Sequence, residues 1–275
     1  MQNQHERAVA FGALHQAPGS FVIPNVWDGG SAAIMAGLGF KALATSSAAC
    51  AATLGRLDGQ ITREEALAHA REVVAASRLP VAADLENGFG ASPQAAAETI
   101  RLAGETGLVG GSIEDASGDE RAPIYDFNHA VERIAAAVEA ARRLPFPFLL
   151  TARAENFIHG RNDLDDTVRR LQAFERAGAD VLFAPCLPDI GAVRTVCSAL
   201  KRPVNFMVGV PGASFSVAEL TAAGVRRISL STTLYRAAMT GVLVAAREVK
   251  ESGTFGYMDS IMRGAELGKY LREKS

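Results

Sequence analysis

Short runs of small apolar residues alternate along the chain with longer segments in which apolar and polar positions follow a helical period. The apolar runs predict eight strands, at residues 22–25, 42–46, 81–84, 111–114, 148–152, 181–184, 204–208 and 227–230. Alanine-rich amphipathic segments between them predict helices, among them 62–76, 93–106, 128–143, 163–177 and 218–223. Strands that alternate with helices indicate parallel β-α-β units.

The ends of several predicted helices carry the residues that start and stop helices. Thr62 and Glu65 form a capping box, and Gly107, Gly178 and Gly224 follow helices where a left-handed residue is favoured. Eight strand–helix units are the content of a (β/α)₈ barrel. An open doubly wound sheet is the alternative, but no G-x-G-x-x-G follows the first strand. The sequence therefore predicts an α/β protein with a (β/α)₈ barrel.

One barrel domain is expected over residues 1–249, because no proline- or glycine-rich linker interrupts it. Residues 250–275 are expected to form a C-terminal helical arm with an apolar-striped helix at 257–272. The stripe must be buried, either on a neighbouring subunit or on its own barrel, and the pattern alone does not choose between the two.

The composition narrows the partners and the compartment. The chain has 275 residues, 48% of them hydrophobic, and a net charge of −2, which gives no electrostatic reason to expect nucleic acid or a membrane surface. No secretory signal and no apolar run of membrane-spanning length is found. The three cysteines, Cys50, Cys186 and Cys197, show no CxxC spacing and are expected to be reduced thiols of a cytoplasmic protein.

Acidic residues stand where successive predicted strands end. Asp84 and Glu86 follow one strand, Glu114 ends the next, and Asp58 lies in an earlier loop. In a barrel the carboxyl ends of the strands meet at one mouth, where four carboxylates would repel one another unless a cation lay among them. Oxygen ligands without clustered histidine or cysteine favour Mg²⁺ or Mn²⁺ over zinc. For each acid taken singly, a helix cap or a surface ion pair is the alternative.

Arg153 ends the fifth predicted strand and faces the same mouth. Its guanidinium suits a carboxylate or a phosphonate, and the alternative is a structural pair with Glu155 or with a metal-site acid. The turn of Ser46 and Ser47 after the second strand offers hydroxyls and backbone N–H groups to an anion.

Asn205 and Trp27 are further candidates for ligand contact. Asn205 lies in an apolar strand, so it is either a hydrogen-bonding group in the mouth or a satisfied core amide. Trp27 follows the first strand, where core packing is the alternative to lining a pocket.

Several motifs in order resemble the isocitrate lyase/phosphoenolpyruvate mutase superfamily over nearly the whole chain. They are Pro24-Asn25-Val26-Trp27-Asp28, Ala44-Thr45-Ser46-Ser47, Asp58, Ala83-Asp84-Leu85-Glu86-Asn87-Gly88, Ser112-Ile113-Glu114-Asp115 and Ala152-Arg153-Ala154-Glu155-Asn156. The last is more similar to the mutase and phosphonopyruvate hydrolase branch than to the lyase branch.

The resemblance implies a barrel whose eighth helix is exchanged between subunits, in dimers that pair into a homotetramer. It implies Mg²⁺ (or Mn²⁺) held by Asp84, with Asp58, Glu86 and Glu114 assisting largely through water. It also implies a 2-oxo acid on that metal, with its carboxylate on Ser46, Ser47 and Arg153.

The segment at 115–123 departs from both branches. It lacks the Lys-Lys-Cys-Gly of the lyases and the lysine and asparagine of the mutases, and it offers Arg121 as a candidate loop cation. We expect a Mg²⁺-dependent lyase that cleaves a C–C bond in a small 2-oxo or 2-hydroxy di- or tricarboxylate through a metal-bound enolate. Its expected catalytic residues are Arg153, Ser46 and Glu114. Two alternatives are P–C bond chemistry on phosphonopyruvate, as mutase or hydrolase, and non-catalytic binding of a 2-oxo acid.

Overall fold

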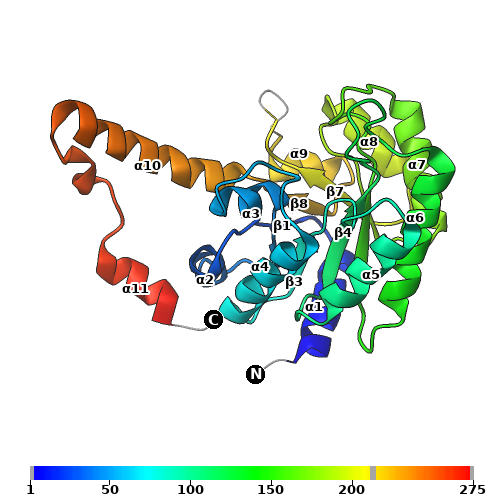
Figure 1. The fold of residues 1–275 in the computed structure, drawn as a ribbon, viewed down its shortest axis with the longest axis horizontal. Helices are drawn as coiled ribbons and strands as arrows, with labels where there is room; N and C mark the ends of the chain where they lie inside the picture. The colour runs from blue at the N-terminus through cyan, green and yellow to red at the C-terminus, as the bar shows by residue number, and fades with distance from the viewer. Residues whose placement is uncertain (1–2, 211–214, 273–275) are drawn as a thin grey trace.

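Eight parallel strands form the centre of the protein, whose computed structural model describes residues 3–210 and 215–272. They are β1 (Phe21–Ile23), β2 (Leu43–Ala44), β3 (Val81–Asp84), β4 (Gly110–Glu114), β5 (Leu149–Arg153), β6 (Val181–Phe183), β7 (Val204–Met207) and β8 (Arg227–Ser229) (Figure 1). Neighbours pair in the order β1-β8-β7-β6-β5-β4-β3-β2. A parallel bridge between Asn25 and Ala44 closes the remaining gap, so the predicted (β/α)₈ barrel is confirmed.

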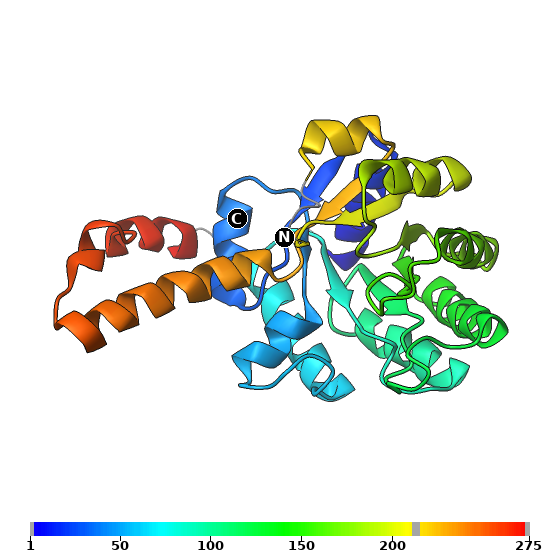
Figure 2. The same cartoon turned by 90° about the horizontal axis from the view of Figure 1, so that it is seen from above.

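Helices lie outside the ring of strands (Figure 2). They are α1 (Gln4–Gln16), α2 (Gly29–Gly37), α3 (Ser47–Thr53), α4 (Arg63–Ala76), α5 (Pro93–Gly104), α6 (Phe127–Arg142), α7 (Leu164–Arg176), α8 (Ile190–Ala199) and α9 (Val217–Ala222). The capping box of Thr62 and Glu65 is formed, and Gly107, Gly178 and Gly224 all have positive φ. Local start and stop signals therefore set these helix ends as predicted.

Alternation along each strand separates the core from the site. On β5, Leu150 and Ala152 are fully buried in the main apolar cluster between strands and helices, whereas Thr151 and Arg153 point into the barrel and line its cavity. The helix α1 covers the opposite end of the barrel, where Phe11 packs with Ile23 in a second apolar cluster. The barrel is thus plugged at one end and open at the other.

The C-terminal part departs from the barrel. Helix α10 (Thr233–Ser252) projects away from it with no buried residue, and η1 (Gly256–Asp259) and α11 (Gly264–Arg272) follow (Figure 1). Helix α11 turns back and packs on α2 of the same chain, where the Tyr270 ring lies against Gly37. In residues 3–210 and 215–272, no helix combines the length and apolarity that a bilayer crossing needs.

The predicted continuous helix at 257–272 is wrong, because it is interrupted between η1 and α11. Its start is held in a turn by Glu248, whose carboxylate accepts the N–H groups of Gly256 and Tyr257 and the hydroxyl of Thr254. Helix α10 spans the expected domain boundary between residues 249 and 250, which stays a prediction.

Candidate active site

A cavity of about 920 Å³ opens at the carboxyl ends of the strands. Its lining carries more acidic than basic groups. They are the carboxylates of Asp58, Glu64, Asp84, Glu86, Glu114 and Glu155, and the guanidinium groups of Arg63, Arg153 and Arg227. Three of the four acids expected at the mouth come from β3 and β4 and the turn after β3, and the fourth, Asp58, comes from the loop after α3. The structure therefore brings all four acids predicted from the sequence to one cavity.

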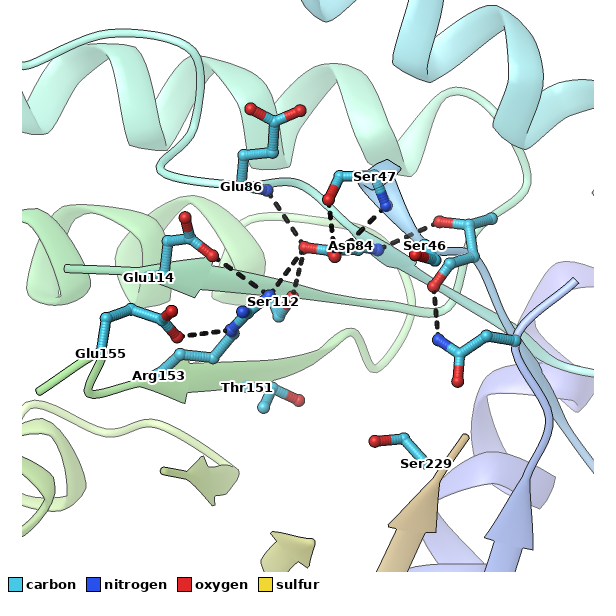
Figure 3. Close-up of polar contacts among 12 residues, drawn as sticks. Ser46, Ser47, Asp84, Glu86, Ser112, Glu114, Thr151, Arg153, Glu155 and Ser229 are labelled. Carbon is cyan, nitrogen blue, oxygen red and sulfur yellow. Dashed lines mark hydrogen bonds and ion pairs between the residues drawn. The ribbon is translucent and has the colours of Figure 1, made fainter. Parts of the chain in front are cut away.

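Asp84 lies at the centre of the site and is held on several sides (Figure 3). Its Oδ2 accepts hydrogen bonds from the N–H and the hydroxyl of Ser47, at 3.3 and 3.1 Å. Its Oδ1 accepts from the N–H of Glu86 at 3.3 Å, the hydroxyl of Ser112 at 3.4 Å and Nη1 of Arg153 at 2.9 Å. The carboxylate is therefore fixed in orientation before any ligand arrives.

Arg153 joins three carboxylates at the end of β5. Nη1 lies 2.9 Å from Asp84 and 3.1 Å from Glu114, and Nε donates to Glu155 at 2.9 Å (Figure 3). Glu114 is its direct neighbour in the β4–β5 register, so the sheet itself sets this pairing. Burial works against the charge, but the Glu114, Glu155 and Asp84 carboxylates hold the pKa of Arg153 well above its usual value. The pairing with Glu155 and metal-site acids, one of the two sequence interpretations, is thus present.

Crowding and burial raise the pKa of the acids and so favour their uncharged forms. Burial raises the pKa of Glu114 well above its usual value against the opposing effect of Arg153. Burial, with the Asp84 and Asp58 charges, raises the pKa of Glu86 to about 7. The pKa of Asp58 is also raised, first by burial. Near neutral pH the cluster therefore retains protons that isolated carboxyl groups would lose.

The donor set suits a hard divalent cation. Oε1 of Glu86 is buried without a hydrogen-bond partner, and the surrounding oxygens belong to carboxylates that repel one another. In the part of the chain that the structure describes, no three acidic, histidine or cysteine side chains are placed to bind one ion together. The residues therefore fit a cation that keeps several water ligands, as Mg²⁺ does, rather than four carboxylates around one point.

The two serines expected to bind an anion also have structural roles. The hydroxyl of Ser46 accepts a hydrogen bond from the N–H of Ala49 and caps α3. The hydroxyl of Ser47 donates to Asp84. Both serines line the cavity.

Asn205 and Trp27 do not line the cavity. The amide of Asn205 accepts from Arg227 and donates to Ser229, so it is the satisfied amide of the two sequence alternatives. Trp27 lies edge-on to Tyr235 of α10 at 5.5 Å between ring centroids, so its side chain packs on α10. The geometry gives no support to ligand contact by either residue.

Sequence reasoning missed two residues of this site. Asn25 donates to the carbonyl of Thr45 and accepts the N–H of Leu230, so it ties together the ends of β1, β2 and β8. Arg227 lines the inner end of the cavity from β8. The signals available were the motif that contains Asn25 and, for Arg227, a charged residue at the start of a predicted strand.

The segment at 115–123 contributes Ala116 and Gly118 to the cavity lining. Arg121 is exposed, and its guanidinium pairs with Asp119 at 3.2 Å. In this arrangement Arg121 does not reach the acid cluster.

The known proteins to which this chain is similar are described as mutases and lyases. The sequence model of the family described as phosphoenolpyruvate phosphomutase matches residues 11–250. A crystal structure from Burkholderia cenocepacia J2315, provisionally described as a lyase/mutase, is 51% identical, with a TM-score of 0.96 over 98% of this chain and 97% of that one.

Two relatives have more specific names. A Corynebacterium glutamicum protein, provisionally named 2-methylisocitrate lyase 1, is 30% identical over 97% of this chain and 89% of its own length. The structure of 2,3-dimethylmalate lyase, a phosphoenolpyruvate mutase/isocitrate lyase superfamily member, is 29% identical, with a TM-score of 0.86 over 98% of this chain and 95% of that one.

Proposed function

Because the chain belongs to the phosphoenolpyruvate phosphomutase family, and so to the isocitrate lyase/phosphoenolpyruvate mutase superfamily, we propose that it cleaves a C–C bond in a small 2-oxo or 2-hydroxy di- or tricarboxylate. The superfamily membership makes it an enzyme of the lyase and mutase type. This favours catalysis over the alternative of a non-catalytic 2-oxo acid binder. The reaction itself is the proposal.

The observation that carries the proposal is the meeting of Asp84, Glu114 and Arg153 at the ends of three adjacent strands. Asp84 would hold a divalent cation, Mg²⁺ or Mn²⁺, with Asp58, Glu86 and Glu114 assisting through water. Such a cation, when bound, supplies Lewis-acid stabilisation of the oxyanion that forms when a bond next to a carbonyl breaks.

The chain's own residues then act on the ligand. Arg153 presents a buried positive charge to the developing oxyanion, since it stays protonated among its carboxylates. Ser46, which lines the cavity at the start of α3, would orient a ligand carboxylate. Oε2 of Glu114 faces Arg153, and burial raises the pKa of this carboxyl, which suits Glu114 to take up or release a proton.

Turnover of a panel of acids tests the proposal. The panel is isocitrate, 2-methylisocitrate and 2,3-dimethylmalate with saturating Mg²⁺, and the carbonyl product is followed as its phenylhydrazone. Asp84→Asn keeps the shape and removes the charge, and we expect at least one substrate to turn over and the variant to lose about a hundredfold or more in kcat/KM. Glu139→Gln, on an exposed surface pair with Arg143, is the matched control and should not change it. Equal activity of Asp84→Asn and wild type would exclude the assignment.

P–C bond chemistry on phosphonopyruvate is the second candidate, and the match to the phosphoenolpyruvate phosphomutase model favours it. Phosphorus NMR of enzyme with phosphonopyruvate distinguishes the outcomes. A phosphate ester indicates a mutase and free phosphate a hydrolase, whereas an unchanged phosphonate resonance eliminates both.

We further propose a homotetramer built from dimers that exchange α10. The support is that α10 has no buried residue in the single chain and that its apolar side chains Val242, Leu243 and Val244 are each more than half exposed. Apolar side chains exposed together favour burial against another subunit. We also propose a cytoplasmic location, because the three cysteines are free, as a reducing compartment would leave them.

A further inference from the structure

A second basic group, Arg227, lies below the acid cluster inside the barrel. It is the first residue of β8 and only 7% exposed, yet it lines the inner end of the cavity. Its Nε donates to Oδ1 of Asn205 at 2.7 Å, and its Nη2 donates across the barrel to the hydroxyl of Thr151 at 3.0 Å. Both partners are neutral.

Arg227 therefore differs from Arg153 in its charge environment. Arg153 faces three carboxylates, whereas none of the acidic groups that the structure describes lies within ion-pair distance of Arg227. Burial and the Arg227 charge lower the pKa of His15 to about 3, so this imidazole is neutral and cannot balance the charge of Arg227. Burial alone lowers the pKa of Arg227 to about 9. A buried cation without a counter-ion is costly, and the cost disappears when an anion binds it.

The hydrogen bonds at Arg227 also leave it able to bind a ligand. A guanidinium has five N–H donors, of which one binds Asn205 and one binds Thr151, so three remain on a side chain that lines the cavity. Asn205 is held in orientation, because its Oδ1 accepts from Arg227 and its Nδ2 donates to Ser229. In Figure 3, Thr151 and Ser229 lie on the other side of Asp84 from Glu86, so the cavity is acidic toward its mouth and basic at its inner end.

The positions of Thr151 and Arg153 along β5 indicate the size of the ligand. Thr151, which bonds Arg227, precedes Arg153 by two residues on β5, and two residues of strand span about 7 Å. A four- or five-carbon chain covers a gap of that order. A ligand with one acid group beside Asp84 and Arg153 would therefore place a second one at Arg227.

We propose that Arg227 is the anchor for the second carboxylate of a four- or five-carbon diacid, at the inner end of the cavity. Arg227 then selects the substrate class of the proposed lyase, on which this inference rests. The role is distinct from that of Arg153, because Arg227 binds the carboxylate at the end of the ligand that does not react.

Two pairs of acids test the proposal by calorimetry with saturating Mg²⁺. Oxaloacetate is compared with 2-oxobutyrate, and 2-oxoglutarate with 2-oxovalerate, since each pair differs only in a distal carboxylate replaced by a methyl group. We expect the wild type to prefer the diacid of at least one pair by about tenfold to hundredfold, the range of one charged hydrogen-bonded contact. Arg227→Met should lose this preference with the affinity for the monoacid unchanged, and Arg227→Lys should keep part of it.

The outcomes separate this site from the proposed function. Equal affinities of the wild type for both members of both pairs would overturn the role of Arg227 and leave monoacid binding at Asp84 intact. A parallel loss of monoacid and diacid affinity in Arg227→Met, with a native circular dichroism spectrum, would reduce Arg227 to a positioning residue and also overturn it. If Arg227→Met does not fold, the wild-type ratios and Arg227→Lys decide. Binding of no 2-oxo acid at all would overturn the proposed function together with this inference.

Discussion

Replacing Arg153 by methionine tests the electrostatics of the site most directly. Arg153 is the guanidinium that contacts Asp84, Glu114 and Glu155, and its side chain is 11% exposed. Methionine keeps much of the length and removes the charge, so three crowded carboxylates lose the cation between them. Removing one partner of a buried ion pair costs about 3–5 kcal/mol of stability.

A surface arginine of the same kind provides the control. Arg101 also contacts two carboxylates, Glu98 and Glu105, but its side chain is 50% exposed. Exposed ion pairs are screened by water and contribute little, so Arg101→Met should destabilise the protein far less than Arg153→Met. The two variants change the same atoms in different surroundings, and the difference between them measures burial.

The cost of Arg153→Met should depend on pH with a definite sign. Burial raises the pKa of Glu114 and Glu155 in the folded protein, and Arg153 opposes that rise, so its removal raises both further. Groups with a raised folded pKa stabilise the fold while protonated and lose that contribution as pH rises through the folded pKa. The variant should therefore be only mildly destabilised at low pH, and its destabilisation should increase as the pH rises.

Thermal unfolding of both variants at about pH 5 and about pH 8, without added metal, measures this effect. We expect the deficit of Arg153→Met to grow between the two pH values and that of Arg101→Met to stay small. The reasoning fails if the two variants lose equal stability at about pH 8, or if the deficit of Arg153→Met shrinks as pH rises.

Three other variants probe the acid turn and the projecting helix. Glu86→Gln removes a group whose folded pKa is about 7 against an ordinary 4.5, so in EDTA it should stabilise the protein by up to about 3 kcal/mol above neutral pH and not at about pH 4, by thermal melting. Gly88→Ala should cost about 1–3 kcal/mol of unfolding free energy, since Gly88 has φ +82° and the new Cβ would lie 2.9 Å from the Cα of Ala96; an unchanged melting curve would contradict this. Leu243→Glu on α10 should lower the oligomer mass in sedimentation, whereas Val9→Glu, equally exposed on α1, should not; equal masses would count against assembly through α10.

The barrel could be predicted because its signals are local. The apolar runs identified all eight strands, and capping residues such as Thr62 set helix ends. The strand at 42–46 came out shorter, as β2, because the side chains that follow it are used otherwise: the Thr45 hydroxyl accepts the N–H of Asp84, and Ser46 caps α3. The start of η1 in the tail was not predictable, since Glu248 accepts the N–H groups of Gly256 and Tyr257, eight and nine residues further along the chain.

In the site, too, local signals predicted some residues, whereas residues that depend on long-range contacts were missed. Asp84, Glu114 and Arg153 were predictable because strand ends and side-chain alternation place them at one mouth. The roles of Asn205 and Arg227 were not, because they depend on the register of β7 with β8 and on a contact that crosses the barrel to Thr151. Alternation tells which residues point inward, but the depth of each inward residue follows only from the stagger of closed strands.

That stagger explains how one barrel places two arginines in different surroundings. The register pairs Glu114 with Arg153 on neighbouring strands, so the same pairing positions Arg153 and supplies a carboxylate to its charge. The same ladder pairs Arg227 with Asn205, an amide that can fix a guanidinium but cannot neutralise it. Neither arrangement favours stability, because one crowds carboxylates and the other buries a lone cation. Both would become favourable with a cation at the mouth and an anion at the inner end, which is the charge arrangement that the proposed metal-chelated diacid would supply.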